Sequence, residues 1–155
     1  MPDLNVVSYC GLHCGSCFLL HDRVADQALA LLGKFKEIGF EKWGPGLAEV
    51  NGELKAFGQA AECCRALEAW DQMRCLQPCR AGGGSGGCKI RVCCQGKQLS
   101  GCWECPECFH CALLDELRQV NGEMHFEHIR DIRSQGLEAC LRKWTAEKPG
   151  KAFRA

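Results

Sequence analysis

The chain has 155 residues, enough for one domain with a modest buried core. Its 19 basic and 19 acidic residues cancel at pH 7, so no strong overall field attracts nucleic acid or membrane surfaces. Cysteine is the outlier, because it supplies 15 of the 155 residues. Either a disulfide framework or thiolate metal ligation accounts for such a density.

Metal ligation is the better explanation of the two. The N-terminal stretch "MPDLNVVSYC" has no basic region followed by an apolar one, which argues against a secretory signal. The cysteine count is odd, and many cysteines are two residues apart, where a disulfide is awkward and a shared tetrahedral ion is easy. No apolar run is long enough to span a membrane. We therefore expect a cytoplasmic metal-binding protein, with a disulfide framework in a secreted fragment as the alternative.

Residues 1–20 are expected to form an N-terminal cysteine loop. The segment "YCGLHCGSC" has the spacing C-x3-C-x2-C, given by Cys10, Cys14 and Cys17. Radical S-adenosylmethionine enzymes use the same spacing, but they need a large barrel around their cofactor, which a chain of this length with little strand pattern cannot supply. The loop therefore predicts a metal site and not a radical enzyme.

A helical body follows this loop. Apolar residues in residues 22–38 recur at helical spacing, and Asp22 is a plausible N-cap. Four glycines and Pro45 in residues 39–52 predict a break. The helical pattern resumes over residues 53–73, where the pair Cys63 and Cys64 is expected to be buried.

The C-terminal part is helical again. Residues 112–120 predict one helix, and residues 123–148 predict two short helices hinged at Gly136. Cys140 falls within the last of these and is expected in the core. Residues 148–155, "KPGKAFRA", are expected to be a frayed tail.

The central segment, residues 75–111, differs in kind. Nine cysteines occur in its 37 positions, among glycine-rich and basic stretches and a linker "AGGGSGG". Because this lobe has few apolar side chains whose burial could drive folding, it would need a bound metal to fold. The sequence thus predicts a mainly α fold: one domain over residues 1–155, with a small helical body and an irregular cysteine-rich metal-binding lobe.

The charge pattern and the histidines give weaker evidence about function than the cysteines do. Between Asp71 and Glu104 there are five basic residues and no acidic one. A nucleic-acid or anion surface is one interpretation, but we favour compensation of the negative charge of a thiolate metal centre. His13 and His110 lie inside cysteine clusters and are expected beside the sites or at the surface rather than as ligands. We recognise no Ser/His/Asp motif in the sequence, so no catalytic residue is predicted.

Several motifs together point to a family. "YCGLHCGSC", "CKIRVC", "GCWECPECFHCALL" and "IRDIRSQGLEACLRKW" occur in this order, and they resemble the cysteine-rich prokaryotic family catalogued as domain of unknown function 3795. The resemblance implies a metal-binding domain with no established activity. Cys75, Cys94 and Cys108 look like additions in this sequence, and Pro78, where the family usually has glycine, leaves the choice between Cys75 and Cys79 open. The family's recurrent cysteines would fall on Cys10, Cys14, Cys17, Cys79, Cys88, Cys93, Cys102, Cys105 and Cys111.

The leading hypothesis is a domain with one or two structural zinc ions that interacts with a protein partner of unknown identity. The N-terminal loop would anchor one site, completed by a cysteine of the central lobe. The rival is an iron–sulfur protein in electron transfer or redox signalling, because "CWECPECFHC" is one residue short of the bacterial four-iron run. The second site would draw on Cys88, Cys93, Cys102, Cys105 and Cys111.

Overall fold

The computed structural model describes residues 3–84 and 86–146 of the chain. Within these residues the protein is mainly α, with seven α-helices, seven short 3-10 helices and no strand beyond an isolated bridge between Val7 and His13. The mainly α prediction is therefore confirmed. None of the described helices combines the length and apolar character that crossing a bilayer requires.

The chain divides into two compact units, residues 1–22 with 75–155 (unit 1) and residues 23–74 (unit 2). The sequence-based assignment of a single domain stays a prediction. Each unit has its own apolar core.

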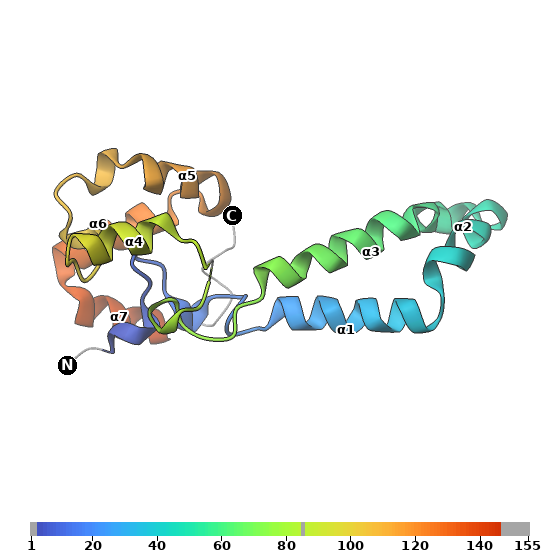
Figure 1. Cartoon of the computed structure of the whole chain (residues 1–155), viewed down its shortest axis with the longest axis horizontal. Helices are drawn as coiled ribbons and strands as arrows, with labels where there is room; N and C mark the ends of the chain where they lie inside the picture. The colour runs from blue at the N-terminus through green and yellow to red at the C-terminus, as the bar shows by residue number, and fades with distance from the viewer. Residues whose placement is uncertain (1–2, 85, 147–155) are drawn as a thin grey trace. The chain divides into compact units, whose positions relative to one another are not determined.

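Unit 2 is built on a helical hairpin (Figure 1). The helices α1 and α3 lie side by side, and α2 and η3 form the turn between them. Its core is made by Leu32, Phe40, Ala60 and Cys64. The elements are α1 (Val24–Glu37), α2 (Phe40–Val50), η3 (Gly52–Gln59), α3 (Ala60–Ala69) and η4 (Trp70–Met73).

The predicted break of the first helix is confirmed, because α1 ends at Glu37 and Gly39 has φ +67°. The segment after it is nevertheless helical, since α2 runs through Pro45. The ring of Phe40 packs 4.5 Å from that of Phe35 and 5.2 Å from those of Trp43 and Phe57, centroid to centroid. Burial of such an aromatic cluster offsets a cost of about 1 kcal/mol per glycine and about 3 for the proline. Tertiary packing thus overrides the local preference.

Two smaller expectations for unit 2 also need correction. The residue that precedes α1 is Arg23, in the left-handed region with φ 52°, and not the expected N-cap Asp22. Cys64 is buried as predicted, with 1% of its surface exposed, whereas Cys63 on the neighbouring face is exposed.

Unit 1 packs four α-helices and several 3-10 turns around one core (Figure 1). The predicted hinge at Gly136 is confirmed, since its φ of +83° separates two helices. Leu114, Phe126, Ile129 and Cys140 are essentially fully buried. The helices are α4 (Lys89–Gly96), α5 (Ala112–Asn121), α6 (Met124–Gln135) and α7 (Leu137–Ala146).

The central lobe is less irregular than predicted. It contains α4, and its residues Ile90, Cys94 and Trp103 belong to the same buried core as α5–α7. The start of the glycine-rich stretch is a tight turn and not a linker, because Gly83 donates its N–H to the carbonyl of Pro78 at 2.9 Å. Apolar packing therefore contributes to the folding of this lobe.

Candidate metal centre

Five cysteines from three separate segments come together in unit 1. We call Cys10, Cys14, Cys17, Cys79 and Cys88 the N-terminal cluster. Burial raises the pKa of the Cys10 thiol to about 11, and the nearby thiols of Cys79 and Cys88 add to the rise. Burial likewise raises the pKa of Cys14 to about 11, with Cys79, Cys17 and Cys10 adding to it. Each of the five therefore lies close enough to another member for their charges to interact.

Local structure aims these sulfurs. Gly11, with φ +89°, turns the chain so that the N–H of Leu12 donates to the sulfur of Cys10. The Ser8 hydroxyl lies 3.0 Å from the same sulfur. Such hydrogen bonds favour the thiolate form and orient a sulfur that binds a metal.

The raised pKa values determine whether these thiols carry a proton at neutral pH. With pKa values of about 11, Cys10 and Cys14 are neutral at pH 7. An ion that binds there must displace their protons, which links its affinity to pH.

A second group of cysteines lines a cavity of about 570 Å³ in unit 1. Two of its sulfurs, those of Cys94 and Cys102, lie 3.7 Å apart. His110 also lines this cavity, whereas the buried ring of His13 lies with Nδ1 3.0 Å from the Ser16 hydroxyl. We call the group the cavity cluster: Cys93, Cys94, Cys102, Cys105, Cys108 and Cys111.

The contact between the two closest thiols of the cavity cluster shifts their pKa values in opposite directions. The hydrogen bond with Cys94, followed by burial, raises the pKa of Cys102. The same bond, with help from Arg80 and Lys97, lowers the pKa of Cys94. Either thiol can donate in this contact.

The loop that carries Cys102 is held by close packing. A side chain on Gly101 would come within 2.2 Å of the buried Trp103 ring, so only glycine fits there. The N–H of Cys102 donates to the carbonyl of Tyr9 at 2.8 Å, which joins this loop to the N-terminal one.

Arginines brace the cysteine loops through carbonyl groups. Arg80 donates from Nε to the carbonyl of Val7 at 2.8 Å and from Nη2 to that of Ser100. Arg133 donates from Nη2 to the carbonyl of Cys105 at 2.5 Å. Both arginines are thus engaged with the backbone of the cysteine loops.

Arg91 makes the most direct contact with a thiol. Its Nη2 donates to the sulfur of Cys79 at 3.7 Å and to the carbonyl of Gly83. Cys75, by contrast, turns its thiol to the carbonyl of Gln77 at 3.3 Å. The placement favours Cys79 over Cys75 as a member of the N-terminal cluster.

The structure sorts the candidate ligands differently from the sequence. Cys88, assigned by spacing to the second site, lies by Cys10. Cys94 and Cys108, regarded as additions, line the cavity. Within residues 3–84 and 86–146, no three His, Cys, Asp or Glu side chains are arranged to hold one ion together. The ligand assignments therefore stay predictions, although the donor chemistry, clustered free thiols with N–H and arginine partners, suits a soft ion.

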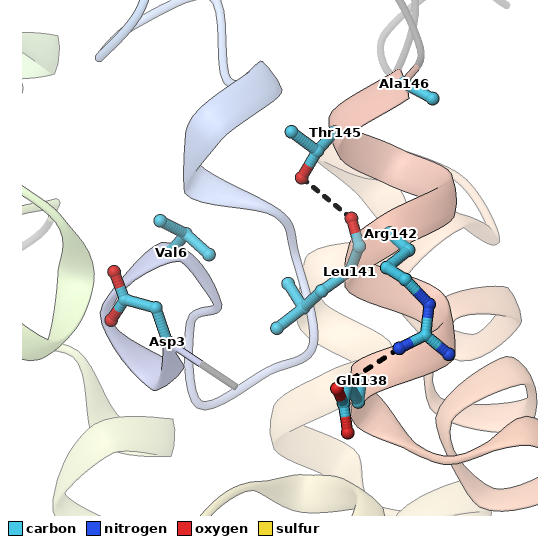
Figure 2. Close-up of a pocket in the computed structure, with 7 residues that line it drawn as sticks. All are labelled: Asp3, Val6, Glu138, Leu141, Arg142, Thr145 and Ala146. Carbon is cyan, nitrogen blue, oxygen red and sulfur yellow. Dashed lines mark hydrogen bonds and ion pairs between the residues drawn. The ribbon is translucent and has the colours of Figure 1, made fainter. Parts of the chain in front are cut away.

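Another cavity, of about 640 Å³, has no cysteine in its lining (Figure 2). It lies between the turn that holds Asp3 and Val6 and the helix α7. Its charged pair, Arg142 and Glu138, is satisfied internally at 3.1 Å.

The fold and site define a class: a helical protein that carries two neighbouring clusters of free thiols. It belongs to the family of proteins of unknown function DUF3795, whose pattern matches residues 6–116 and so takes in both clusters. Comparisons with curated proteins and with solved structures gave no match.

Proposed function

We propose that this protein is a metal-binding domain in which zinc, held by the two thiol clusters, plays a structural part. The observation that carries this proposal is the convergence of the N-terminal cluster. Thiols from the loop at residues 10–17, from Cys79 and from Cys88 meet although up to 78 residues separate them in sequence. Zinc binds thiolates tightly without redox chemistry, and its binding free energy would stabilise the loops.

The alternative is an iron–sulfur protein that handles electrons. The cavity of about 570 Å³ is lined by six cysteines, four of them in the run C-x2-C-x2-C-x2-C, and offers room for a group larger than one ion. This observation favours the alternative for the cavity cluster alone.

The state of the cysteines supports a reducing compartment. All 15 are free thiols, so we place the protein in the cytoplasm. For the protein partner, unit 2 offers exposed apolar side chains such as Ile38, Trp43 and Val50.

The deciding experiment is elemental analysis with an absorption spectrum on protein purified without oxygen. Near-stoichiometric zinc in a colourless solution supports the zinc proposal. Iron with acid-labile sulfide and a brown colour supports the alternative. Protein that folds and binds neither metal contradicts both.

Serine variants test the clusters separately. Cys14→Ser and Cys105→Ser should each lower both metal content and thermal stability, because an incomplete ligand set holds its ion weakly. Cys63→Ser is the matched control, since Cys63 is exposed in unit 2 and lies in neither cluster. Unchanged metal content and stability in either variant would remove that residue from the ligand set.

A further inference from the structure

The peptide group between Gly11 and Leu12 makes a hydrogen bond at each end. Its N–H, on Leu12, donates to the sulfur of Cys10. Its carbonyl, on Gly11, lies 3.0 Å from Nδ1 of His128 in α6. A carbonyl oxygen can only accept a hydrogen bond, so Nδ1 of His128 carries a proton and donates it. One peptide group therefore joins a helix of the core to a thiol of the N-terminal cluster.

The geometry of the peptide couples these two hydrogen bonds. A trans peptide is planar, so its C=O and N–H point in opposite directions and rotate together. A hydrogen bond that fixes the carbonyl of Gly11 therefore also fixes the direction of the N–H of Leu12. Hydrogen bonds arranged in a chain polarise one another as well, so donation by His128 strengthens the contact of Leu12 with the sulfur.

Packing holds both the imidazole and the loop in place. The His128 ring stacks on the buried ring of Trp144 in α7, with 4.3 Å between their centroids. Gly11 is buried so close to α6 that a Cβ on it would come within 3.3 Å of Ile129 and 3.6 Å of the carbonyl oxygen of His125. The loop thus packs directly on α6, within reach of the His128 donor.

We propose that His128 is a positioning residue for the N-terminal cluster: by fixing the peptide group between Gly11 and Leu12, it directs the N–H of Leu12 at the sulfur of Cys10. This inference rests on the metal-binding function proposed above. Groups that orient a metal ligand typically contribute about 10–100-fold to metal affinity. Loss of the His128 donor should therefore weaken zinc binding at this cluster and leave the cavity cluster unchanged.

The first test uses the wild-type protein, so folding of a variant is not at issue. In nitrogen-15 NMR spectra of the histidine rings, the signals of Nδ1 and Nε2 show which nitrogen carries the proton. The neutral ring of His128 should be the Nδ1–H tautomer. The Nε2–H tautomer would overturn the inference, because its Nδ1 has no proton to donate to Gly11.

The second test separates the hydrogen bond from the stack. His128→Phe keeps a ring against Trp144 but has no donor, whereas His128→Asn has an amide N–H near the position of Nδ1 but no ring. Histidine and asparagine have similar helix propensities, so α6 should form in either case. Each zinc-loaded protein is titrated with a chelator, and the thiols that become free are alkylated and located by mass spectrometry.

In His128→Phe, Cys10 should be labelled at a chelator concentration about tenfold lower than in the wild type, and His128→Asn should restore the wild-type value. Cys105 of the cavity cluster is the reference within the same molecule. Equal shifts at Cys10 and Cys105 would show a general loss of stability and overturn the inference. Wild-type labelling of Cys10 in His128→Phe would overturn it too.

The asparagine variant keeps the inference testable even if His128→Phe does not fold. Labelling of Cys10 in His128→Asn at a tenfold lower chelator concentration than in the wild type would overturn the role of the donor. A wild-type protein whose Cys10 is labelled equally with and without zinc would instead defeat the proposed function at this cluster, whichever tautomer His128 shows. The two failures are therefore distinguishable.

Discussion

The guanidinium of Arg91 donates to the thiol of Cys79, 3.7 Å away, and to the carbonyl of Gly83. Arg91 lies in α4, twelve residues after Cys79, so one cation ties the cysteine turn to the helix. It also supplies positive charge where a metal-bound thiolate would carry negative charge.

Replacement of this arginine should destabilise the turn. Arg91→Met keeps much of the side-chain length but removes both hydrogen bonds, and we expect a loss of about 1–3 kcal/mol in the free energy of unfolding. Urea denaturation measures it. Lys89→Met, an exposed cation on the same helix, is the control and should change stability little. Equal stabilities of the two variants would show that the contact contributes nothing.

Gly83 should tolerate no side chain. A Cβ there would lie 1.6 Å from the carbonyl oxygen of Gln77, which is backbone and cannot rotate away. We expect Gly83→Ala to cost at least about 1–3 kcal/mol of folding stability, as overpacking does, and to lower metal content by displacing Cys79. Gly86→Ala meets nothing within 4 Å and should behave as the wild type. Thermal melting and elemental analysis compare them; a Gly83→Ala protein with wild-type values would contradict the described turn.

Metal affinity should rise steeply with pH. Because burial raises the pKa of Cys10 and of Cys14 to about 11, both are protonated at neutral pH, and binding releases their protons. These two protons alone predict an affinity that increases at least about 100-fold per pH unit between pH 6 and 8, and each further thiol ligand that loses a proton on binding makes the slope steeper. Competition with a chelator of known pH dependence measures this slope. A slope near zero would show that these two thiols are not ligands.

Protonation of His125 should oppose folding. His125 is fully buried with its ring 4.2 Å from that of Phe126, and burial lowers its pKa below the ordinary 6.5. The unfolded chain therefore takes up this proton more readily, so stability is fully present above pH 6.5 and falls as the pH drops toward the folded-state value. In urea titrations at several pH values, the wild type should lose stability relative to His125→Leu on acidification. A constant difference between the two would disprove the assignment.

Sequence periodicity predicted the helices correctly where local and tertiary preferences agree. The two C-terminal helices and their hinge at Gly136 follow directly from the apolar spacing and the glycine. It failed at α2, because the contacts that stabilise Phe40 come from Phe35 and Phe57, outside the segment. No local pattern contains them.

The grouping of the cysteines shows the same difference between what local spacing predicts and what long-range packing decides. Spacing identified Cys10, Cys14 and Cys17 as one group, because they share a loop. It grouped Cys88 with the later cysteines, whereas the thiol of Cys88 interacts with that of Cys10, and it counted Cys94, whose sulfur contacts that of Cys102, as an addition. A cysteine's neighbours in space depend on long-range packing of the chain. A signal for Cys94 was present in its helical spacing from Ile90, which places both in the core.

By itself, the sequence determined the mainly helical class, the abundance of thiols and the family, since composition, periodicity and motif spacing are local properties of a chain. Only the tertiary structure decided which thiols lie together. It alone shows that Arg91 donates a hydrogen bond to Cys79 and that the sulfur of Cys94 contacts that of Cys102. These pairings depend on long-range packing, in which many weak contacts between distant segments select one arrangement.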